Sequence, residues 1–311
     1  MKEIRVPAFA KVNLRLEILG RRADGYHELR TVFQSLTLHD SLHLSFTSGP
    51  GRGREIDLRV EGDPALSAAP VKKNLVWRAL SILRRELKLR RGIRAELHKR
   101  IPAGRGLGGG SSDAAAALAG LLRLSGRRIA PQRLIEIAAG LGADVPFFLF
   151  GGRALGVSRG DEIYPLPELP RQLILIVSPP DLGVITRQAY AWLGRGLTMR
   201  GTMPKLWCFC ALCWSPSGSS LRNDFEAAVF RRHPRLARIK RELLEQGAAD
   251  ASLAGSGSAV FGVFPNPAQA RRAARKFPED RVFHCATLSR KAYSRALWGA
   301  AGPLWQSRTD S

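Results

Sequence analysis

The chain has 311 residues, of which 45% are hydrophobic and four are cysteine. This length suits about two domains with real cores, and so few cysteines exclude a disulfide-stapled scaffold. The formal net charge is +23, but basic residues are spread along the chain, which favours attraction of anionic substrates over nucleic-acid binding. The N-terminus lacks the apolar segment of a signal peptide, and the longest apolar stretch is far shorter than the roughly 20 residues of a membrane span. We therefore expect a cytoplasmic protein with neither a membrane nor a nucleic-acid partner.

Alternating apolar and polar residues dominate the first half of the chain. Residues 12–18 follow this pattern, which predicts a half-buried strand whose polar face carries Lys11, Asn13 and Arg15. Two further segments show the same alternation: residues 55–60 and 92–101. The first half is therefore predicted to be rich in β-structure.

Three helices are expected among these strands. The first covers residues 75–87, where apolar residues recur at helical spacing and Asn74 is placed to cap the N-terminus. The other two are predicted at residues 114–124 and 131–141.

The second half alternates strands and helices, which predicts a second α+β domain with an antiparallel sheet. Segment 161–170 is interpreted as the connection between the two domains. Strands are expected at residues 172–180, just before residue 254, at 259–264 and at 281–288, and helices within 224–246 and at 267–277. The last twenty or so residues are expected to form a loosely attached extension. The predicted domains are residues 1–165 and 166–288, followed by the extension 289–311.

Segment 101–117 (IPAGRGLGGGSSDAAAA) holds five glycines within seven residues. Each glycine costs about 0.5–1 kcal/mol relative to alanine in a regular element, so this density indicates a need for bare backbone. Glycine-rich backbone that opens a helix forms an anion cradle, to which the positive end of the helix contributes. Ser111 and Ser112 are placed to cap this helix or to bind a phosphate or Mg²⁺, and Asp113 to lie in its first turn. A tight turn with ordinary caps is the alternative.

Three common nucleotide-binding patterns do not fit this segment. There is no G-x-x-x-x-G-K-[ST] loop. Gly104, Gly106 and Gly109 satisfy G-x-G-x-x-G, but no acidic residue follows about twenty residues later, as a dinucleotide site requires. The partner motifs of a protein kinase are also absent.

The glycine segment resembles the second motif of the GHMP kinases, a family of small-molecule kinases, and residues 7–29 and 253–264 resemble the first and third motifs. Segments 23–29 (ADGYHEL) and 142–148 (GADVPFF) narrow the resemblance to members that act on 4-diphosphocytidyl-2-C-methyl-D-erythritol in non-mevalonate isoprenoid synthesis. They disfavour members that act on homoserine, mevalonate or a sugar. A basic nucleic-acid-binding protein is the alternative from another class. Residues 196–221 and those after about 290 depart from the family pattern.

The resemblance implies an α+β fold in which a ribosomal-S5-like N-terminal domain joins a ferredoxin-like C-terminal domain, with ATP and substrate between them. It implies ATP-dependent phosphorylation of the 2-hydroxyl of the cytidylylated substrate. We expect a monomer or a homodimer. Mg²⁺ would arrive with ATP. Asp144 is implied as the general base and Lys11 as its partner; in isolation, each could be an ordinary surface charge.

The remaining site residues are also assigned by resemblance. The ATP-binding residues are Pro102, Ala103, Gly104, Arg105, Gly106, Leu107, Gly108, Gly109, Gly110, Ser111 and Ser112. The supporting glycine loop comprises Gly255, Ser256, Gly257 and Ser258, with a plain strand-to-strand turn as the alternative. The substrate-binding residues are Asn13, Tyr26, His27, Thr186 and Tyr190.

The family pattern implies how cytosine is held. Tyr26 would stack on one face of the base and His27 would hydrogen-bond its polar edge. Thr186 and Tyr190 are spaced to share one helix face, with Thr186 as the N-cap. Tyr190 would close the second face of the base, or would instead pack on the domain core.

Cys208, Cys210 and Cys213 form a C-x-C-x₂-C pattern, to which Cys285 could add a fourth ligand. Zinc sites usually show paired C-x₂-C or a nearby His pair. We therefore expect incidental or buried cysteines and no metal site.

Overall fold

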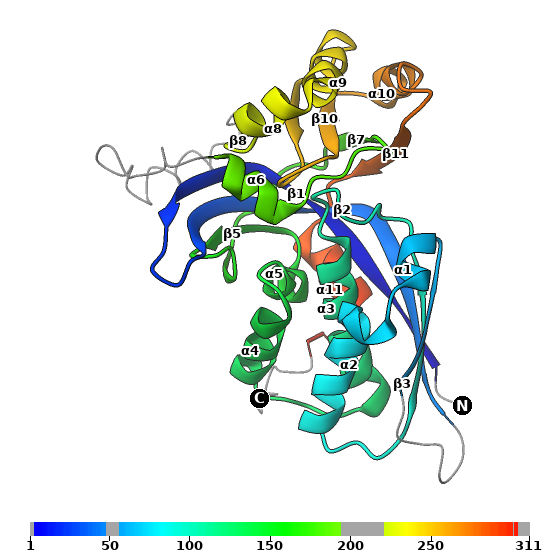
Figure 1. Cartoon of the computed structure of the whole chain (residues 1–311). Coiled ribbons are helices and arrows are strands. Elements are labelled where there is room, and N and C mark those ends of the chain that lie inside the picture. Colours follow the sequence, from blue (N-terminus) through cyan, green and yellow to red (C-terminus); the bar gives the residue numbers. More distant parts are fainter. Residues whose placement is uncertain (1–2, 48–55, 194–220, 301, 304–311) are drawn as a thin grey trace.

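The computed structural model describes residues 3–47, 56–193, 221–300 and 302–303. Within these ranges the strands form two sheets (Figure 1). The larger sheet has the order β3-β4-β2-β1-β8, and β5 pairs with β2 and β6. Its strands are β1 (Glu3–Arg21), β2 (His27–Phe46), β3 (Ile56–Glu61), β4 (Ile93–His98), β5 (Arg153–Val157), β6 (Glu162–Pro165) and β8 (Arg222–Asn223).

The smaller sheet has the order β11-β7-β10-β9, and its neighbouring strands are antiparallel, as predicted. Its strands are β7 (Leu173–Ser178), β9 (Asp250–Leu253), β10 (Val260–Phe264) and β11 (Arg281–Ala286). The two sheets share an apolar core that joins β1 and β2 to β7 and β10, with Val12, Leu36, Ile176 and Phe261 fully or almost fully buried in it.

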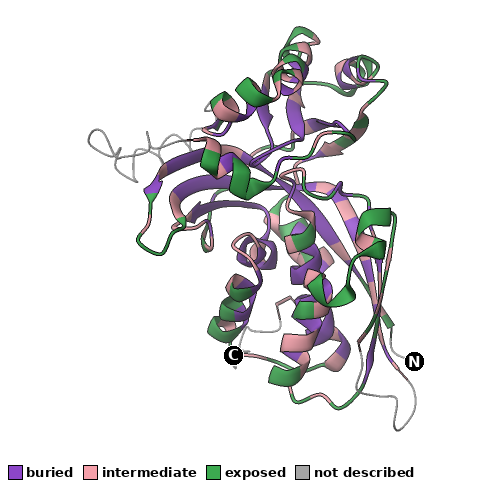
Figure 2. Cartoon of the chain, viewed as in Figure 1, coloured by how far each residue is buried: buried purple, intermediate pink, exposed green. Residues whose placement is uncertain are grey.

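Helices cover one face of the larger sheet and one side of the smaller (Figure 1). The first group comprises α1 (Pro64–Ala68), the short 3₁₀ helix η1 (Val71–Lys73), α2 (Leu75–Glu86), α3 (Gly109–Ser125), α4 (Pro131–Leu141), α5 (Val145–Phe150) and α11 (Arg290–Trp298). The second comprises α6 (Thr186–Trp192), α8 (Glu226–Arg232), α9 (Pro234–Glu245) and α10 (Pro267–Ala274). The buried residues line the faces where helices meet sheet (Figure 2). No helix in the described ranges offers an apolar stretch long enough to cross a bilayer.

Helices α2 and α4 begin where the sequence predicts, whereas α3 begins earlier. Asn74 caps α2 by accepting a hydrogen bond from the Val76 N–H at 2.9 Å, and α4 has the predicted bounds. Helix α3 begins at Gly109, five residues before the predicted start, with Gly108 as a left-handed N-cap (φ 72°). The expected capping role of Ser111 and Ser112 is therefore wrong, because both lie inside the helix.

The prediction of a half-buried β1 with an exposed polar face is wrong. Lys11 and Asn13 are only 4% and 2% exposed. Val12, which points to the opposite face, is also fully buried, so both faces of β1 are covered at this point. The polar face is therefore covered by other parts of the protein, and its side chains pair with one another.

Two predicted boundaries also need correction. Segment 161–170 is not simply a connection, because β6 within it pairs with β5 and extends the larger sheet. The extension is not loosely attached over α11: Tyr293, Leu297 and Trp298 are buried in the core of the first helix group. A sequence reading missed this because the buried residues are separated from the rest of that core by the entire second sheet.

Candidate active site

Lys11 and Asp144, predicted to act together, form an ion pair with Lys11 Nζ 3.3 Å from Asp144 Oδ2. The Lys11 ammonium also donates to Asn13 Oδ1 at 2.8 Å and lies 5.3 Å from the centroid of the Phe33 ring. Asn13 in turn donates to Thr31 Oγ1 at 2.7 Å. The ammonium is thus held from several sides, while the Asp144 side chain keeps a 33% exposed surface.

Asp144 stands immediately before α5, a helix whose residues 145–149 are all buried. Its carboxylate makes no capping bond to that helix. A carboxylate that does not cap its own helix is available to pair with Lys11 and to accept a proton from a bound hydroxyl. The apolar helix fixes where this carboxylate lies.

The glycine segment lies directly beside this pair. Gly104, Gly106 and Gly108 have left-handed φ angles of 67°, 79° and 72°. A Cβ at Gly108 would lie 2.7 Å from Phe148 and 3.0 Å from Lys11, whereas a Cβ at Gly104 would meet nothing within 4 Å. The Lys11 N–H also donates to Leu107 O at 3.0 Å. The glycines therefore allow the loop to press against the lysine, and the open space at Gly104 leaves backbone accessible to a ligand.

The loop ends at the N-terminus of α3, whose first N–H groups have no acceptor within the helix. The first intrahelical bond joins the Ser112 N–H to Gly108 O at 2.9 Å. Ser112 Oγ is buried and has no hydrogen-bond partner in the described part of the chain. Aligned N–H groups at a helix start bind anions, so this segment fits the phosphates of ATP. Within it Pro102, Leu107 and Ser112 are buried, and Ala103, Gly104 and Gly110 are exposed.

A buried charge cluster of Lys99, Asp40 and Asp113 lies against the glycine segment, where a Cβ at Gly109 would be 3.3 Å from Lys99 Nζ. Sequence reasoning missed Lys99 and Asp40. The Lys99 ammonium donates to carboxylates of Asp40 and Asp113, the latter at 2.6 Å. All three side chains are at most 3% exposed, and Asp40 also accepts from the Ile101 N–H at 2.8 Å. Asp113, expected simply to favour the helix start, instead belongs to this cluster. Burial raises its pKa despite the nearby ammonium.

The sequence does contain a signal for Asp40. Along β2, the positions that face the core are Leu36, Leu38, Asp40, Leu42 and Leu44. A carboxylate at an apolar position of a period-two pattern requires a buried partner.

The sequence gives no comparable indication for Asn223. Its side-chain amide donates to Leu253 O at 2.8 Å and to Gly255 O at 2.7 Å, and so holds the third motif in place.

The predicted supporting loop does abut the glycine segment. A Cβ at Gly106 would lie 1.8 Å from Ala254 O. Arg105 donates to Ser258 Oγ at 3.1 Å, and the Ala259 N–H donates to Arg105 O at 3.2 Å. The second and third motifs therefore form one continuous backbone surface.

The predicted substrate residues are brought together only in part. The rings of His27 and Tyr190 stack at 4.3 Å, and Phe225 packs edge-on against Tyr190 at 4.9 Å. Burial, with a contribution from the charge of Asp144, raises the pKa of Tyr190 to about 12. Tyr26 is 55% exposed, with the Arg159 guanidinium 4.9 Å from its ring.

Tyr190 thus favours the core-packing alternative, since its ring is occupied by protein side chains. Thr186 is not the N-cap of α6, because Ile185 holds that position without a side-chain capping bond. Thr186 Oγ1 instead lies 2.9 Å from Ser256 Oγ and links α6 to the third motif.

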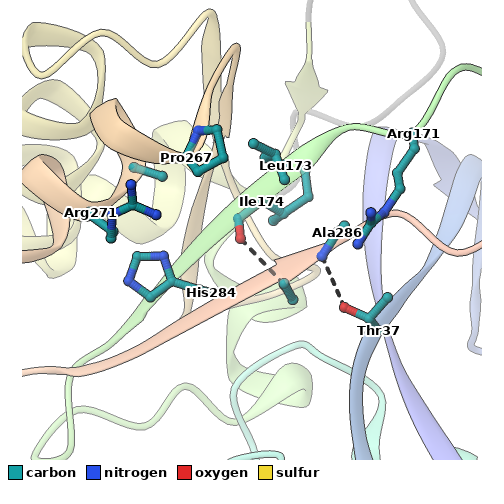
Figure 3. Close-up of a pocket in the computed structure, with 10 residues that line it drawn as sticks. Thr37, Arg171, Leu173, Ile174, Pro267, Arg271, His284 and Ala286 are labelled. Atoms are coloured by element: carbon teal, nitrogen blue, oxygen red, sulfur yellow. Dashed lines mark hydrogen bonds between the residues drawn. The ribbon is translucent and has the colours of Figure 1, made fainter.

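A separate pocket of about 390 Å³ lies over β7, β11 and α10, with Arg171, Arg271 and His284 around it (Figure 3). None of the predicted site residues lines it. Cys285 also lines this pocket and forms no disulfide with a described residue. Burial raises its thiol pKa to about 12. Cys208, Cys210 and Cys213 lie outside the described residues.

Comparison with known proteins identifies the family. The GHMP kinases N terminal domain matches residues 74–152, and the GHMP kinases C terminal domain matches residues 206–281. The 4-diphosphocytidyl-2-C-methyl-D-erythritol kinase of Solibacter usitatus (strain Ellin6076) is 44% identical over 299 residues, covering 94% of this chain and 91% of the relative.

Solved structures similar to this chain support the same family assignment. A crystal structure of 4-(cytidine 5'-diphospho)-2C-methyl-D-erythritol kinase has a TM-score of 0.75 at 33% identity, covering 91% of this chain and 99% of that chain. Homoserine kinase from Cytophaga hutchinsonii ATCC 33406 has a TM-score of 0.69 at 20% identity, covering 93% and 95%, and shares the fold alone. The predicted α+β GHMP kinase fold is confirmed, and the chain belongs to the 4-diphosphocytidyl-2-C-methyl-D-erythritol kinase family of the GHMP kinases.

Proposed function

We propose that this chain is the ATP-dependent kinase that phosphorylates the 2-hydroxyl of 4-diphosphocytidyl-2-C-methyl-D-erythritol, with Asp144 as the general base. The observation that carries the proposal is the Lys11–Asp144 pair, with its 3.3 Å separation, next to the glycine segment. The names of the relatives support the substrate. The reaction belongs to isoprenoid precursor synthesis.

Each group has a defined task in this reaction. ATP supplies the phosphoryl group. The N–H groups of the glycine segment and of the α3 N-terminus hold its phosphates and balance their charge. Asp144 accepts the hydroxyl proton as the new P–O bond forms. Lys11 orients Asp144 and stabilises negative charge on the transferring group.

Mg²⁺ would be held mainly by the phosphates themselves, as is usual for this ion. Of the residues predicted to bind ATP, Ser111 and Ser112 offer hydroxyl oxygens. The Ser112 hydroxyl is buried and has no hydrogen-bond partner among the described residues. The donor set therefore fits an ion that arrives with ATP.

The cytosine site differs from a simple sandwich between two tyrosines. We assign the exposed ring of Tyr26 as the stacking surface for the base. His27 would hydrogen-bond the polar edge of the base, and burial together with the charge of Arg21 keeps its pKa below the ordinary value, so the ring is neutral. Tyr190 then acts as a positioning residue that fixes the plane of His27.

The proposal is tested by ADP release with Mg-ATP and a panel of alcohols. We expect release with 4-diphosphocytidyl-2-C-methyl-D-erythritol and only background release with homoserine or mevalonate. Release with homoserine or mevalonate, and none with the cytidylylated alcohol, would assign the chain to another GHMP kinase activity.

A further inference from the structure

Two histidines and a glutamate gather on the face of the larger sheet that lies opposite its helices. Leu42 and Leu44 of β2 and Leu97 of β4 are buried in the helix-covered core. The alternate positions therefore point to the other face, and they include His43 on β2 and Glu96 and His98 on β4. All three are partly exposed.

The strand register places these residues side by side. His43 is directly opposite Glu96. His98 is opposite Ser41 and hence diagonal to His43. The two imidazole rings lie 5.1 Å apart at 59°. One ligand atom from each of the three residues lies within 4.8 Å of the others.

This spacing is close to that of a metal site. Zinc binds histidine nitrogen and carboxylate oxygen at about 2.0–2.2 Å, so two ligands of one ion lie at most about 4 Å apart. Small side-chain rotations would bring the three atoms onto a common ion. Two imidazoles and a carboxylate suit zinc and its neighbours among the transition metals, whereas Mg²⁺ and Ca²⁺ prefer oxygen alone.

Acidic residues on adjacent strands support the same geometry. Glu61 Oε2 lies 3.0 Å from His98 Nδ1, and Glu3 Oε1 lies 3.9 Å from His43 Nδ1. A carboxylate at Nδ1 is the usual outer partner of a metal-bound histidine, because it orients the ring and leaves Nε2 for the ion. Glu61 holds this position at His98, whereas Glu3 is too far from His43 for a hydrogen bond.

The positive charges of two nearby arginines disfavour binding of a cation at this site. Arg5 is in register with His43, and Arg59 with Glu96. The arginines lower the affinity for an ion, but Glu3, Glu61 and Glu96 supply three opposing charges.

We propose that His43, Glu96 and His98 form a binding site for one divalent transition-metal ion of the zinc class, completed by water and oriented by Glu61. The ion would join β2 to β4. His98 immediately precedes Lys99 of the buried charge cluster, so the ion would also stiffen the strand that leads into the glycine segment. The site is separate from the proposed phosphoryl-transfer site.

The test uses untagged, chelator-treated full-length protein without ATP, because a histidine tag would itself bind the ion. Co²⁺ serves as an optical probe of the ligands, and Zn²⁺ binding is measured by calorimetry. We expect one ion with visible cobalt bands but no sulfur-to-cobalt charge-transfer band, and a higher melting temperature with Zn²⁺.

Variants identify the ligands. His43→Gln, Glu96→Gln and His98→Gln should each weaken binding at least tenfold, and Glu61→Gln about 10–100-fold, as loss of an outer partner usually does. His284→Gln, a change of an exposed histidine on β11, is the matched control and should bind normally. The melting temperatures without ion report whether each variant is folded.

Three results would overturn the proposal. One is that His43→Gln and His98→Gln leave the wild-type affinity unchanged. Another is a bound cobalt with a strong thiolate band, which would assign the ion to cysteines instead. Absence of binding to the folded wild-type protein would also contradict the site.

Discussion

At the scale of single residues, the Lys11–Asp144 pair carries the proposed chemistry. Asp144→Asn removes the proton acceptor but keeps the size of the side chain, so we expect kcat to fall by about 10²–10⁴-fold while ATP affinity changes little. Lys11→Ala should reduce kcat comparably. Steady-state kinetics and ATP titration measure both effects.

The matched control for this prediction is Asp57→Asn, a surface carboxylate on β3 that pairs with Arg94 at 3.6 Å. Its kcat should remain normal. A normal kcat for Asp144→Asn would show that another group accepts the proton.

Gly108→Val should weaken ATP binding and lower kcat together. The new side chain would collide with Phe148 and Lys11, and the left-handed φ of 72° would strain any residue with a Cβ. Gly126→Val separates the two causes, because Gly126 has a similar φ of 67° but open space around its Cβ position. Equal ATP affinities in the two folded variants would exclude a cradle at Gly108.

Tyr26→Ala should raise KM for the cytidylylated substrate more than tenfold and leave KM for ATP unchanged. Base–aromatic stacking contributes about 1–3 kcal/mol, or roughly 5–150-fold in affinity. His27→Ala should also reduce the preference for cytidine over uridine analogues, because a hydrogen bond to the base edge discriminates between bases.

Tyr164→Ala, at a tyrosine that is 54% exposed on β6, is the control and should show wild-type KM. Tyr190→Phe should keep the stack on His27 and hence base preference. If Tyr26→Ala and His27→Ala both retain wild-type KM and preference, cytosine is recognised by other residues.

The sequence identifies residues whose chemistry is distinctive within a motif and misses those that are defined by their partners. Lys11, Asp144 and the glycines stand in recognisable patterns. Lys99 and Asn223 do not, because their roles come from contacts with Asp113 and Gly255, which the folded chain brings close. The same limit explains Tyr190, whose neighbours His27 and Phe225 are distant in sequence.

At the scale of elements, α11 braces the helix that follows Asp144. Tyr293 Oη donates to Phe148 O at 2.7 Å, and Trp298 Nε1 donates to Leu149 O at 3.1 Å. A Cβ at Gly151 would lie 2.1 Å from the Tyr293 ring. The glycine after α5 therefore makes room for an aromatic residue that arrives from the other end of the chain.

Trp298→Ala should lower the free energy of unfolding by about 3–5 kcal/mol, as expected for removing a large buried aromatic side chain. Tyr293→Phe removes only a buried hydrogen bond and should cost about 1 kcal/mol. Lys291→Ala, an exposed change on the same helix, should cost little. Urea unfolding measures all three, and equal stabilities would mean that α11 is dispensable.

The ends of helices and the burial of strand faces are harder to predict from the sequence than the presence of the elements. The strands and helices of the second half lie close to their predicted ranges. Its strands β7 and β10 form apolar runs because they are buried on both faces, between the helices and the larger sheet. The start of α3 and the covered face of β1 were not predicted, because tertiary contacts determine both. Gly108 is the left-handed N-cap of α3 and packs against Phe148 and Lys11, and pairing of Lys11 with Asn13 and Asp144 permits burial of a charge.

At the scale of the whole molecule, the buried cluster of Lys99, Asp40 and Asp113 should make stability depend on pH. Two carboxylates share one ammonium, and burial raises the pKa of Asp113 above its value in the unfolded chain, about 4. The folded protein therefore holds a proton that the unfolded chain releases. Its stabilising contribution is complete below pH 4 and is lost as pH rises toward the raised pKa.

Asp113→Asn removes this titration and keeps an oxygen that can accept from Lys99. The free energy of unfolding of the wild-type protein should therefore fall, relative to that of the variant, as pH rises above about 4. Urea unfolding across this range measures the difference. Parallel curves would contradict the raised pKa.

The position of the new phosphate tests the central claim most directly. The product formed from Mg-ATP and 4-diphosphocytidyl-2-C-methyl-D-erythritol can be examined by ³¹P NMR. The account predicts one new phosphomonoester signal, whose phosphorus–carbon coupling places the phosphate on the oxygen of carbon 2. The diphosphate signals of the cytidine diphosphate group should be preserved. Asp144→Asn should give no such signal on the same timescale. Phosphate on another hydroxyl, or only free phosphate from ATP hydrolysis, would contradict it.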